Sequence, residues 1–272
     1  MRLDPFPENS QIPSFYPEDS YPCYREEKNS AGFKRTVQRW VVKSAKPAGW
    51  NPFKWIGKLI LSPVRRRVGG VPKTKLPGPV LDAGCGDGTF LDLLKEAGWP
   101  VEGFEMSPTA AEAARQRGLS VQTGTIESIQ LPQECFASVR FWHVLEHLPD
   151  PLAALEKAKQ WIQPGGELII GIPNAASFYA KLFGSRWSAW ETPRHLYHFT
   201  PRTIRRLVEK SGFDSIRVIH CSVGTGASSL GEKASRMLWL RALGLAGDIV
   251  LDGLKQGDSL EIHAIRPQVP VR

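Results

Sequence analysis

The sequence predicts an α/β fold: a doubly wound, Rossmann-like domain with a mostly parallel sheet, preceded by an N-terminal extension with helical and extended parts. Three observations support this prediction. Residues 80–94 change from a buried-strand pattern to a helical pattern through a glycine-rich turn, strand and helix patterns alternate from there onward, and turn-forming residues separate them. With 272 residues the chain can form one core with appended segments.

The chain is predicted to have three parts. Residues 1–33 form an extended arm, because five prolines are distributed among aromatic residues there. Residues 34–75 form a basic amphipathic segment, and residues 76–267 form the α/β domain with an insertion at about 224–257. Charged residues interrupt the apolar part of this insertion, which favours a packed segment over a membrane helix.

The net charge of +8 is concentrated in the second part, because residues 34–75 contain twelve Lys or Arg and no Asp or Glu. Two amphipathic stretches are predicted within it, one with Trp40 on its apolar face beside Val37, Val41 and Ala45, and a second over residues 53–60. Trp40 and Trp55 lie between the basic residues. Two interpretations remain open for residues 34–68. The segment contacts an anionic membrane surface or another anionic partner, or it caps the domain with a solvated basic face.

Cysteine usage and hydropathy indicate the compartment. The four cysteines form no CxxC pair, so the sequence predicts neither a disulfide framework nor a cysteine zinc site. No uncharged apolar run approaches the roughly 18 residues of a spanning helix, and no apolar leader follows the first residues. We expect a cytoplasmic protein, peripheral at the inner membrane surface if the basic segment binds lipid.

Within the α/β domain, helices are predicted where a capping residue precedes an apolar period of 3.6, as at Ser107 before Pro108 and Thr200 before Pro201. The predicted helices are 90–97, 107–117, 151–162 and 200–211. The predicted strands are one that ends at Leu81, followed by 101–104, 119–123, 137–142, 168–172, 214–220 and 259–265.

The turn VLDAGCGDGTF, residues 80–90, is predicted to hold a ligand, since glycine permits positive φ and the following helix offers unpaired N–H groups. It lacks the Gly-Lys-Ser/Thr end of a P-loop. Its glycines are spaced two and two, whereas a dinucleotide fingerprint has two and three. Acids beside the glycines, such as Asp82, suit a ligand that carries an ammonium and a sulfonium group. These features favour S-adenosylmethionine.

The run LDAGCGDGTFL resembles the first motif of the class I S-adenosylmethionine-dependent methyltransferases, in their small-molecule, ubiquinone-methyltransferase-like branch. The resemblance implies a seven-strand sheet and S-adenosylmethionine as cofactor. Glu105 lies 17 residues after Gly88, which is close to the spacing at which an acid in such folds binds the ribose hydroxyls. The resemblance to the family implies this role for Glu105. The cofactor-binding residues predicted together are Asp82, Gly84, Cys85, Gly86, Glu105, Met106 next to the adenine, and the backbone of Thr125 and Ile126.

The run FWHVLEHLPDP, residues 141–151, also resembles the family and contains His143, Glu146 and His147 in an HxxEH pattern. On a helix these three side chains would share a face, as in an inverted zinc-protease motif. Outside the motif the sequence shows no evident third ligand. Some ubiquinone-type methyltransferases that bind a divalent ion have Glu where this chain has His143, and this difference argues against their metal site here. We predict a structural role and no metal.

The run WSAWETPRHLYHFT, residues 187–200, follows the fifth predicted strand and is similar to one subgroup of small-molecule methyltransferases. His195 is the candidate general base for an acceptor hydroxyl, because histidine titrates near neutral pH. Arg194 beside it could hold an anionic acceptor, and His143 is the rival base. The alternative is that these aromatic and imidazole side chains only seal a loop.

The sequence therefore predicts methyl transfer to a small-molecule or lipid-linked acceptor, with oxygen as the methylated atom. A non-catalytic membrane or RNA adaptor on the same fold is the main alternative, and an NAD-dependent oxidoreductase fits the glycine spacing less well. DNA is disfavoured as a partner, because the Asn/Asp-Pro-Pro-aromatic run of base methyltransferases is missing after the fourth strand. The basic segment leaves RNA open.

Overall fold

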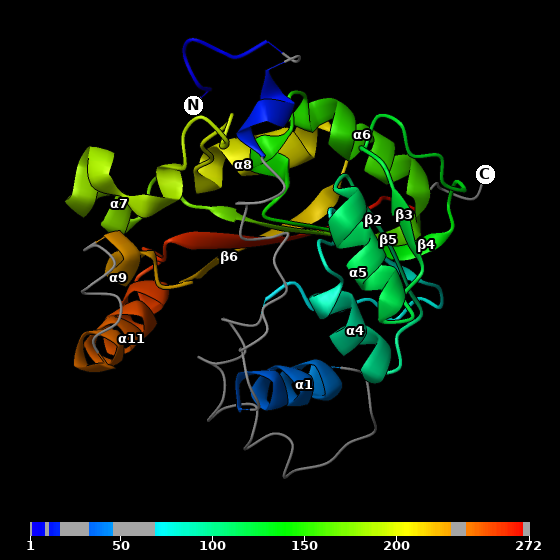
Figure 1. Cartoon of the computed structure of the whole chain (residues 1–272), viewed down its shortest axis with the longest axis horizontal. Helices are drawn as coiled ribbons and strands as arrows, with labels where there is room; N and C mark the ends of the chain where they lie inside the picture. Colours follow the sequence, from blue (N-terminus) through cyan, green and yellow to red (C-terminus); the bar gives the residue numbers. More distant parts are fainter. Residues whose placement is uncertain (1, 9–10, 17–32, 46–68, 230–237, 269–272) are drawn as a thin grey trace.

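The computed structural model describes residues 2–8, 11–16, 33–45, 69–229 and 238–268 (Figure 1). They form a seven-stranded sheet in the order β3-β2-β1-β4-β5-β7-β6. Its strands are β1 (Val80–Ala83), β2 (Val101–Glu105), β3 (Val121–Thr123), β4 (Phe136–Trp142), β5 (Ile162–Pro173), β6 (Asp214–Cys221) and β7 (Ser259–Ile265). Every neighbouring pair is parallel except those of β7, which runs antiparallel to β5 and β6. The predicted doubly wound, mostly parallel fold is confirmed.

Helices cover both faces of the sheet (Figure 1). On one face lie α1 (Phe33–Ala45), α4 (Thr89–Glu96) and α5 (Pro108–Gln116), and on the other lie α6 (Pro151–Trp161) and α8 (Pro201–Lys210). The main core lies between the sheet and the second pair, where Leu155 and Ile204 meet strand residues such as Phe141. Two short helices, α7 (Phe178–Phe183) and α9 (Thr225–Ser229), lie together with the longer α11 (Leu238–Gly253) at one end of the molecule.

The helices begin where the capping residues predict. Ser107, Asp150 and Thr200 each accept a backbone N–H three residues later, and each precedes a proline at the first helical position. Four short 3-10 helices complete the described elements: η1 (Ile12–Phe15), η3 (Leu145–His147), η4 (Gly184–Arg186) and η5 (Ser188–Trp190).

Strand β5 begins earlier than the sequence predicts. Its expected start is Leu168, but it pairs with β4 already at Ile162, and the register shifts before Glu167. The Pro-Gly-Gly segment between these points protrudes from the ladder, with Gly165 at φ 78° and its N–H bonded to the carbonyl of Arg266 at 2.9 Å. Glycine and proline thus mark a bulge within a strand here, not the turn before it.

The basic segment is helical where it is described. Helix α1 packs Val42 against Leu94 of α4, and its arginines pair with acids of α4: Arg35 with Asp92 at 2.5 Å and Arg39 with Glu96 at 2.5 Å. Trp40, predicted on the apolar face, is 41% exposed. The second predicted amphipathic stretch, 53–60, lies outside the described residues.

Residues 69–76 connect this segment to β1 across the sheet. The backbone N–H groups of Lys73 and Thr74 donate to the buried carboxylate of Glu167 on β5. Gly70 lies against Trp142, where a Cβ atom would be 2.7 Å from the indole ring. This crossing segment therefore contacts both β4 and β5.

The insertion contributes α9 and α11, and it precedes β7. Within the ranges given above, no helix combines the length and apolar character that crossing a membrane requires.

Candidate active site

The glycine turn joins β1 to α4 in a conformation that requires its glycines. Gly84, Gly86 and Gly88 have φ values of 71°, 55° and 75°, in the left-handed region that side chains with a Cβ atom disfavour. The N–H groups of Gly84 and Cys85 donate to the carbonyl of Phe104 at 2.8 and 3.1 Å, which ties the turn to β2. The turn is thus rigid and carries little side-chain bulk, which suits close approach of a ligand.

Glu105 ends β2 beside this turn, as the sequence predicts. One carboxylate oxygen accepts the N–H of Gly86 at 3.0 Å and the other accepts the N–H of Ser107 at 2.9 Å. The side chain is buried, and this burial raises the pKa of Glu105 despite those hydrogen bonds. An ionised carboxylate has about four lone-pair sites, so the two that remain can accept two further hydrogen bonds. These acceptor oxygens fit a ribose diol, whose hydroxyls would donate to them.

Met106 and the turn after β3 lie next to Glu105. Met106 is exposed, and the N–H of Gly124 donates to the carbonyl of Glu105 at 2.9 Å. The N–H of Thr125, expected to meet an adenine, donates instead to Oγ of Ser128 at 2.9 Å. The residues predicted for the nucleoside therefore lie together, but this backbone donor already has a partner.

Asp82 lies underneath the turn and pairs with Arg140 of β4. Both of its oxygens accept hydrogen bonds from Nη1 of Arg140, at 2.7 and 2.9 Å, and the side chain is 2% exposed. The guanidinium lies 4.0 Å from the ring centre of Phe90 and 4.7 Å from that of Trp142. The carboxylate thus supports the turn from below, and a direct contact with a ligand ammonium stays a prediction.

The HxxEH run does not form the helix on which its three side chains would share a face. His143 directly follows β4 with φ 55°, and only Leu145–His147 form the 3-10 helix η3. Glu146 is 1% exposed, and its Oε1 lies 3.3 Å from Nδ1 of His143. Burial opposes its ionisation, but the hydrogen bond from His143 and the charges of nearby imidazoles outweigh this and hold the pKa of Glu146 at about 2. Its Oε2 is buried and has no hydrogen-bond partner among the described residues.

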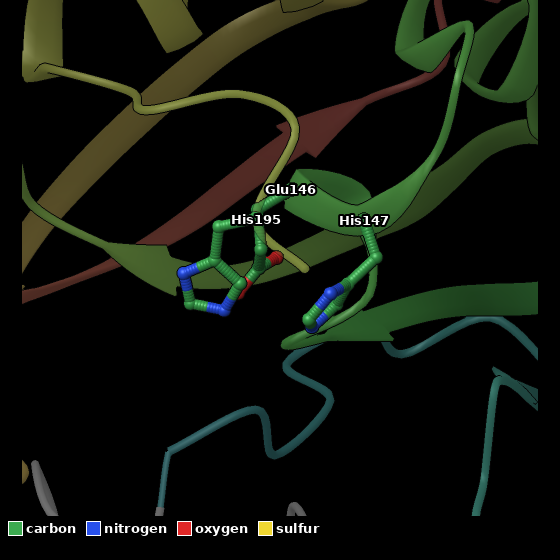
Figure 2. Close-up of side chains that lie close together, drawn as sticks. All are labelled: Glu146, His147 and His195. Atoms are coloured by element: carbon green, nitrogen blue, oxygen red, sulfur yellow. The ribbon is translucent and has the colours of Figure 1, made fainter. Parts of the chain in front are cut away.

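His195 is brought to this carboxylate by the loop between η5 and α8. Its Nδ1 lies 2.9 Å from the carbonyl of Ala189, an acceptor, so Nδ1 is the nitrogen that donates there, and Nε2 lies 4.0 Å from a carboxylate oxygen of Glu191. Its ring centre is 4.6 Å from that of His147. Figure 2 shows the two imidazoles side by side with the carboxylate of Glu146 between them, and one ligand atom from each residue lies within 4.8 Å of the others.

Carboxylate and imidazole are both metal ligands, so Glu146, His147 and His195 could also hold a divalent ion. His195 is the third ligand that the sequence motif alone lacks. The prediction that these residues have a structural or acid–base role and no metal stays a prediction.

The N-terminal arm contributes Tyr16, which the sequence did not single out. Its hydroxyl lies 2.9 Å from Nδ1 of His147 and 3.3 Å from the carbonyl of Arg194. The arm is held against the same loop by the N–H of Leu3, which donates to the carbonyl of Leu196 at 2.9 Å. Aromatic content was the one sequence signal that this arm packs on the domain.

The two tryptophans of the cluster have structural contacts. Nε1 of Trp187 donates to Thr225 at 2.9 Å and Nε1 of Trp190 donates to the carbonyl of Gly184 at 2.7 Å. For these two residues the structure agrees with the loop-sealing alternative.

The glycine turn and the histidine cluster adjoin. A Cβ atom at Gly84 would lie 2.7 Å from Cγ2 of Val144, the residue between His143 and η3. A ligand on the glycine turn would therefore lie beside the imidazoles. The arrangement combines the glycine turn, the buried carboxylate of Glu146 and the imidazole of His195.

Comparison with known proteins agrees with this arrangement. The model of a family described as Methyltransferase domain matches residues 58–218. The ubiquinone biosynthesis O-methyltransferase of Xanthomonas oryzae is 31% identical over 129 residues, which cover 44% of this chain and 54% of that protein. The enzyme of the same name from Cereibacter sphaeroides is 29% identical over 149 residues, covering 50% and 60%. The chain thus spans about half the length of the curated relatives it matches.

Solved structures share the fold. An S-adenosylmethionine-dependent methyltransferase from Thermotoga maritima superposes with a TM-score of 0.54 at 22% identity, covering 85% of this chain and 92% of that one. Phosphoethanolamine N-methyltransferase 2 of Haemonchus contortus, crystallised with S-adenosyl-L-methionine, gives 0.51 at 16% identity, covering 86% and 57%.

Proposed function

The chain belongs to the class I S-adenosylmethionine-dependent methyltransferases, and from this premise we propose that it methylates a hydroxyl oxygen of a small-molecule or lipid-linked acceptor. The observation that carries the proposal is the contact of Nδ1 of His195 with the carbonyl of Ala189, which leaves Nε2 as the ring nitrogen that could accept a proton. The ubiquinone biosynthesis relatives are named as O-methyltransferases, which supports oxygen as the acceptor atom.

Four features of the chain would hold the cofactor. Glu105 would accept the ribose hydroxyls, and Met106 would lie against the adenine. The turn of Gly84, Cys85 and Gly86, with Asp82 beneath it, would line the methionine part. When bound, S-adenosylmethionine supplies an electrophilic methyl group on its sulfonium, so the protein mainly has to align the acceptor and remove a proton.

His195 would remove that proton. Nε2 would take the hydroxyl proton as the new O–C bond forms, while Nδ1–H stays on the carbonyl of Ala189. The imidazolium would face the carboxylate of Glu146, which is already ionised and has an unpartnered oxygen. His143 is the rival base, because the contact of its Nδ1 with Glu146 likewise leaves its Nε2 able to accept a proton.

A non-catalytic adaptor role is the second candidate, in which residues 34–68 contact an anionic membrane or RNA. The observation in its favour is the unbroken basic charge of that segment. Against it, Arg35 and Arg39 are engaged by acids of α4. We also propose a cytoplasmic location, on the basis of the cysteine usage and hydropathy of the sequence.

Turnover with radiolabelled S-adenosylmethionine, against a lipid extract and a small-metabolite extract, tests the proposal. His195→Asn is the informative variant, because the asparagine amide can still donate to the carbonyl of Ala189 while the base is removed. We expect turnover to fall by about 10²- to 10⁴-fold with unchanged cofactor affinity. His220→Asn, on β6 outside the cluster, is the matched control.

Each result that contradicts the proposal leads to a different conclusion. If His195→Asn turns over within a few-fold of the wild type and His143→Asn does not, the base is His143. If no extract is labelled although calorimetry detects S-adenosylmethionine binding, the adaptor role gains support. Binding of NAD in place of S-adenosylmethionine would sink the assignment.

A further inference from the structure

Exposed apolar side chains gather at one end of the molecule. In the described part of the chain eight large apolar side chains are exposed, and six of them belong to α7, α11, the residue directly after α11 and the turn before α9. These six are Phe178, Leu182, Val223, Ile249, Val250 and Leu254. Figure 1 shows α7, α9 and α11 grouped together, away from α4 and α5. Single exposed apolar residues are ordinary, but a cluster of this kind marks an interaction surface.

The helices that carry these residues are fixed to each other. The N–H of Phe178, at the start of α7, donates to the carbonyl of Gln256 just after α11, at 3.2 Å. The hydroxyl of Tyr179 donates to Asp248 of α11 at 3.0 Å. Leu182 is 58% exposed and Leu254 66%. We call the exposed residues of α7, α11 and the turn at Val223 the α7–α11 surface.

The charge of this surface is positive. Lys181, Arg186 and Lys255 are exposed along it. The two acids of α11 are buried, since Asp248 accepts from Tyr179 and Asp252 accepts from Ser222. Residues 178–186 contain no acid at all. Apolar side chains rimmed by lysine and arginine, with the acids turned inward, complement an anionic lipid headgroup layer over its acyl chains.

We propose that the α7–α11 surface docks on an anionic phospholipid bilayer. This contact is distinct from the basic segment, whose described arginines are engaged within the domain. It also lies close to the candidate base: the N–H of Ser188 in η5 donates to Ser229 of α9, and the carbonyl of Ala189 in η5 binds His195. Docking would bring a lipid-linked acceptor to His195, a consequence that rests on the proposed function, whereas the docking itself does not.

Vesicle sedimentation of the full chain tests the docking. The probes are vesicles of phosphatidylcholine alone and of phosphatidylcholine with phosphatidylglycerol. We expect the wild type to bind the anionic vesicles, and Leu182→Glu/Leu254→Glu to bind them at least about tenfold more weakly, since two apolar insertions are lost. Lys181→Glu/Lys255→Glu should remove the preference for anionic vesicles.

Trp40→Asp is the matched control, because it removes an exposed apolar residue from α1 and should leave vesicle binding unchanged. Since all substituted positions are exposed, circular dichroism should confirm that each variant is folded. Equal wild-type binding to both vesicle types, or wild-type binding by the leucine variant, would overturn the proposal. Loss of vesicle binding in Trp40→Asp would also overturn it, because it would assign the membrane contact to the basic segment. A wild-type dimer that becomes a monomer in the leucine variant would overturn it as well, because the surface would then be an interface between two copies. These readouts need no turnover, so failure of docking and failure of the proposed methyl transfer are separate results.

Discussion

Replacing Arg140 by methionine tests the ion pair beneath the glycine turn. Nη1 of Arg140 binds both oxygens of Asp82, and the two side chains are 5% and 2% exposed. Methionine is unbranched and can fill much of the space between the rings of Phe90 and Trp142, so the main change is loss of the charge. Asp82 is then left buried without its partner.

The expected cost follows from that isolation. Removing one partner of a buried ion pair destabilises a protein by about 3–5 kcal/mol, because the other charge stays uncompensated. Loss of the contacts with the two rings adds about 1 kcal/mol. We expect Arg140→Met to lower the free energy of unfolding by about 4 kcal/mol, and Asp82→Asn/Arg140→Met to recover about half of that loss, because no charge remains to be buried.

Urea unfolding followed by circular dichroism at constant pH measures both variants. A loss below about 1 kcal/mol in the single variant, the range of an exposed pair, would refute the reasoning. A double variant no more stable than the single one would refute it too. Calorimetry of the folded double variant adds a functional result: near-normal affinity for S-adenosylmethionine would show that Asp82 acts by supporting the turn and not by direct contact.

Three further predictions concern the site. Gly86→Leu, which forces a side chain into the left-handed region, and Glu105→Ala should each abolish measurable calorimetric binding of S-adenosylmethionine, and unchanged affinity would contradict the assignment. Burial lowers the pKa of His198 to about 4 and also lowers that of His147, so the folded state resists protonation that the unfolded chain accepts near pH 6.5. Stability should therefore be full above about pH 6.5 and fall by about 1–3 kcal/mol towards pH 4, and a urea midpoint independent of pH in this range would exclude it. Elemental analysis should find no tightly held zinc, and one zinc per chain that His147→Ala loses would reverse this expectation.

The sequence predicts the fold well because its signals are local. The glycines after Leu81 and the caps at Ser107 and Thr200 act within four residues of their position, and the structure has a turn or a helix start at each. Where the sequence errs, a distant partner decides the outcome. The Pro-Gly-Gly segment near Gly165 is held in β5 by the carbonyl of Arg266, about a hundred residues away in the chain.

The site is predictable in part for the same reason. Glu105 follows from its distance to the glycines, and His195 from its place after the fifth strand. The pairing of Asp82 with Arg140, and the hydroxyl of Tyr16 on His147, are contacts between residues 58 and 131 positions apart. No pattern in the sequence reports such contacts, because each partner alone has an ordinary local environment.

The convergence of Glu146 and His195 has a backbone cause. The N–H groups of Leu196 and Tyr197 both donate to the carbonyl of Glu146, at 2.9 and 3.2 Å. This contact fixes the loop that carries His195 to η3, which carries the carboxylate. Leu3 of the arm then donates to the carbonyl of Leu196, so the arm is tied to the same loop. Because the side chain of Val144, just before η3, lies against Gly84, the loop that carries the imidazole is tied to an element that adjoins the glycine turn. Side-chain variants at this cluster can therefore remove chemistry without moving the loop, which is the condition that makes His195→Asn a fair test.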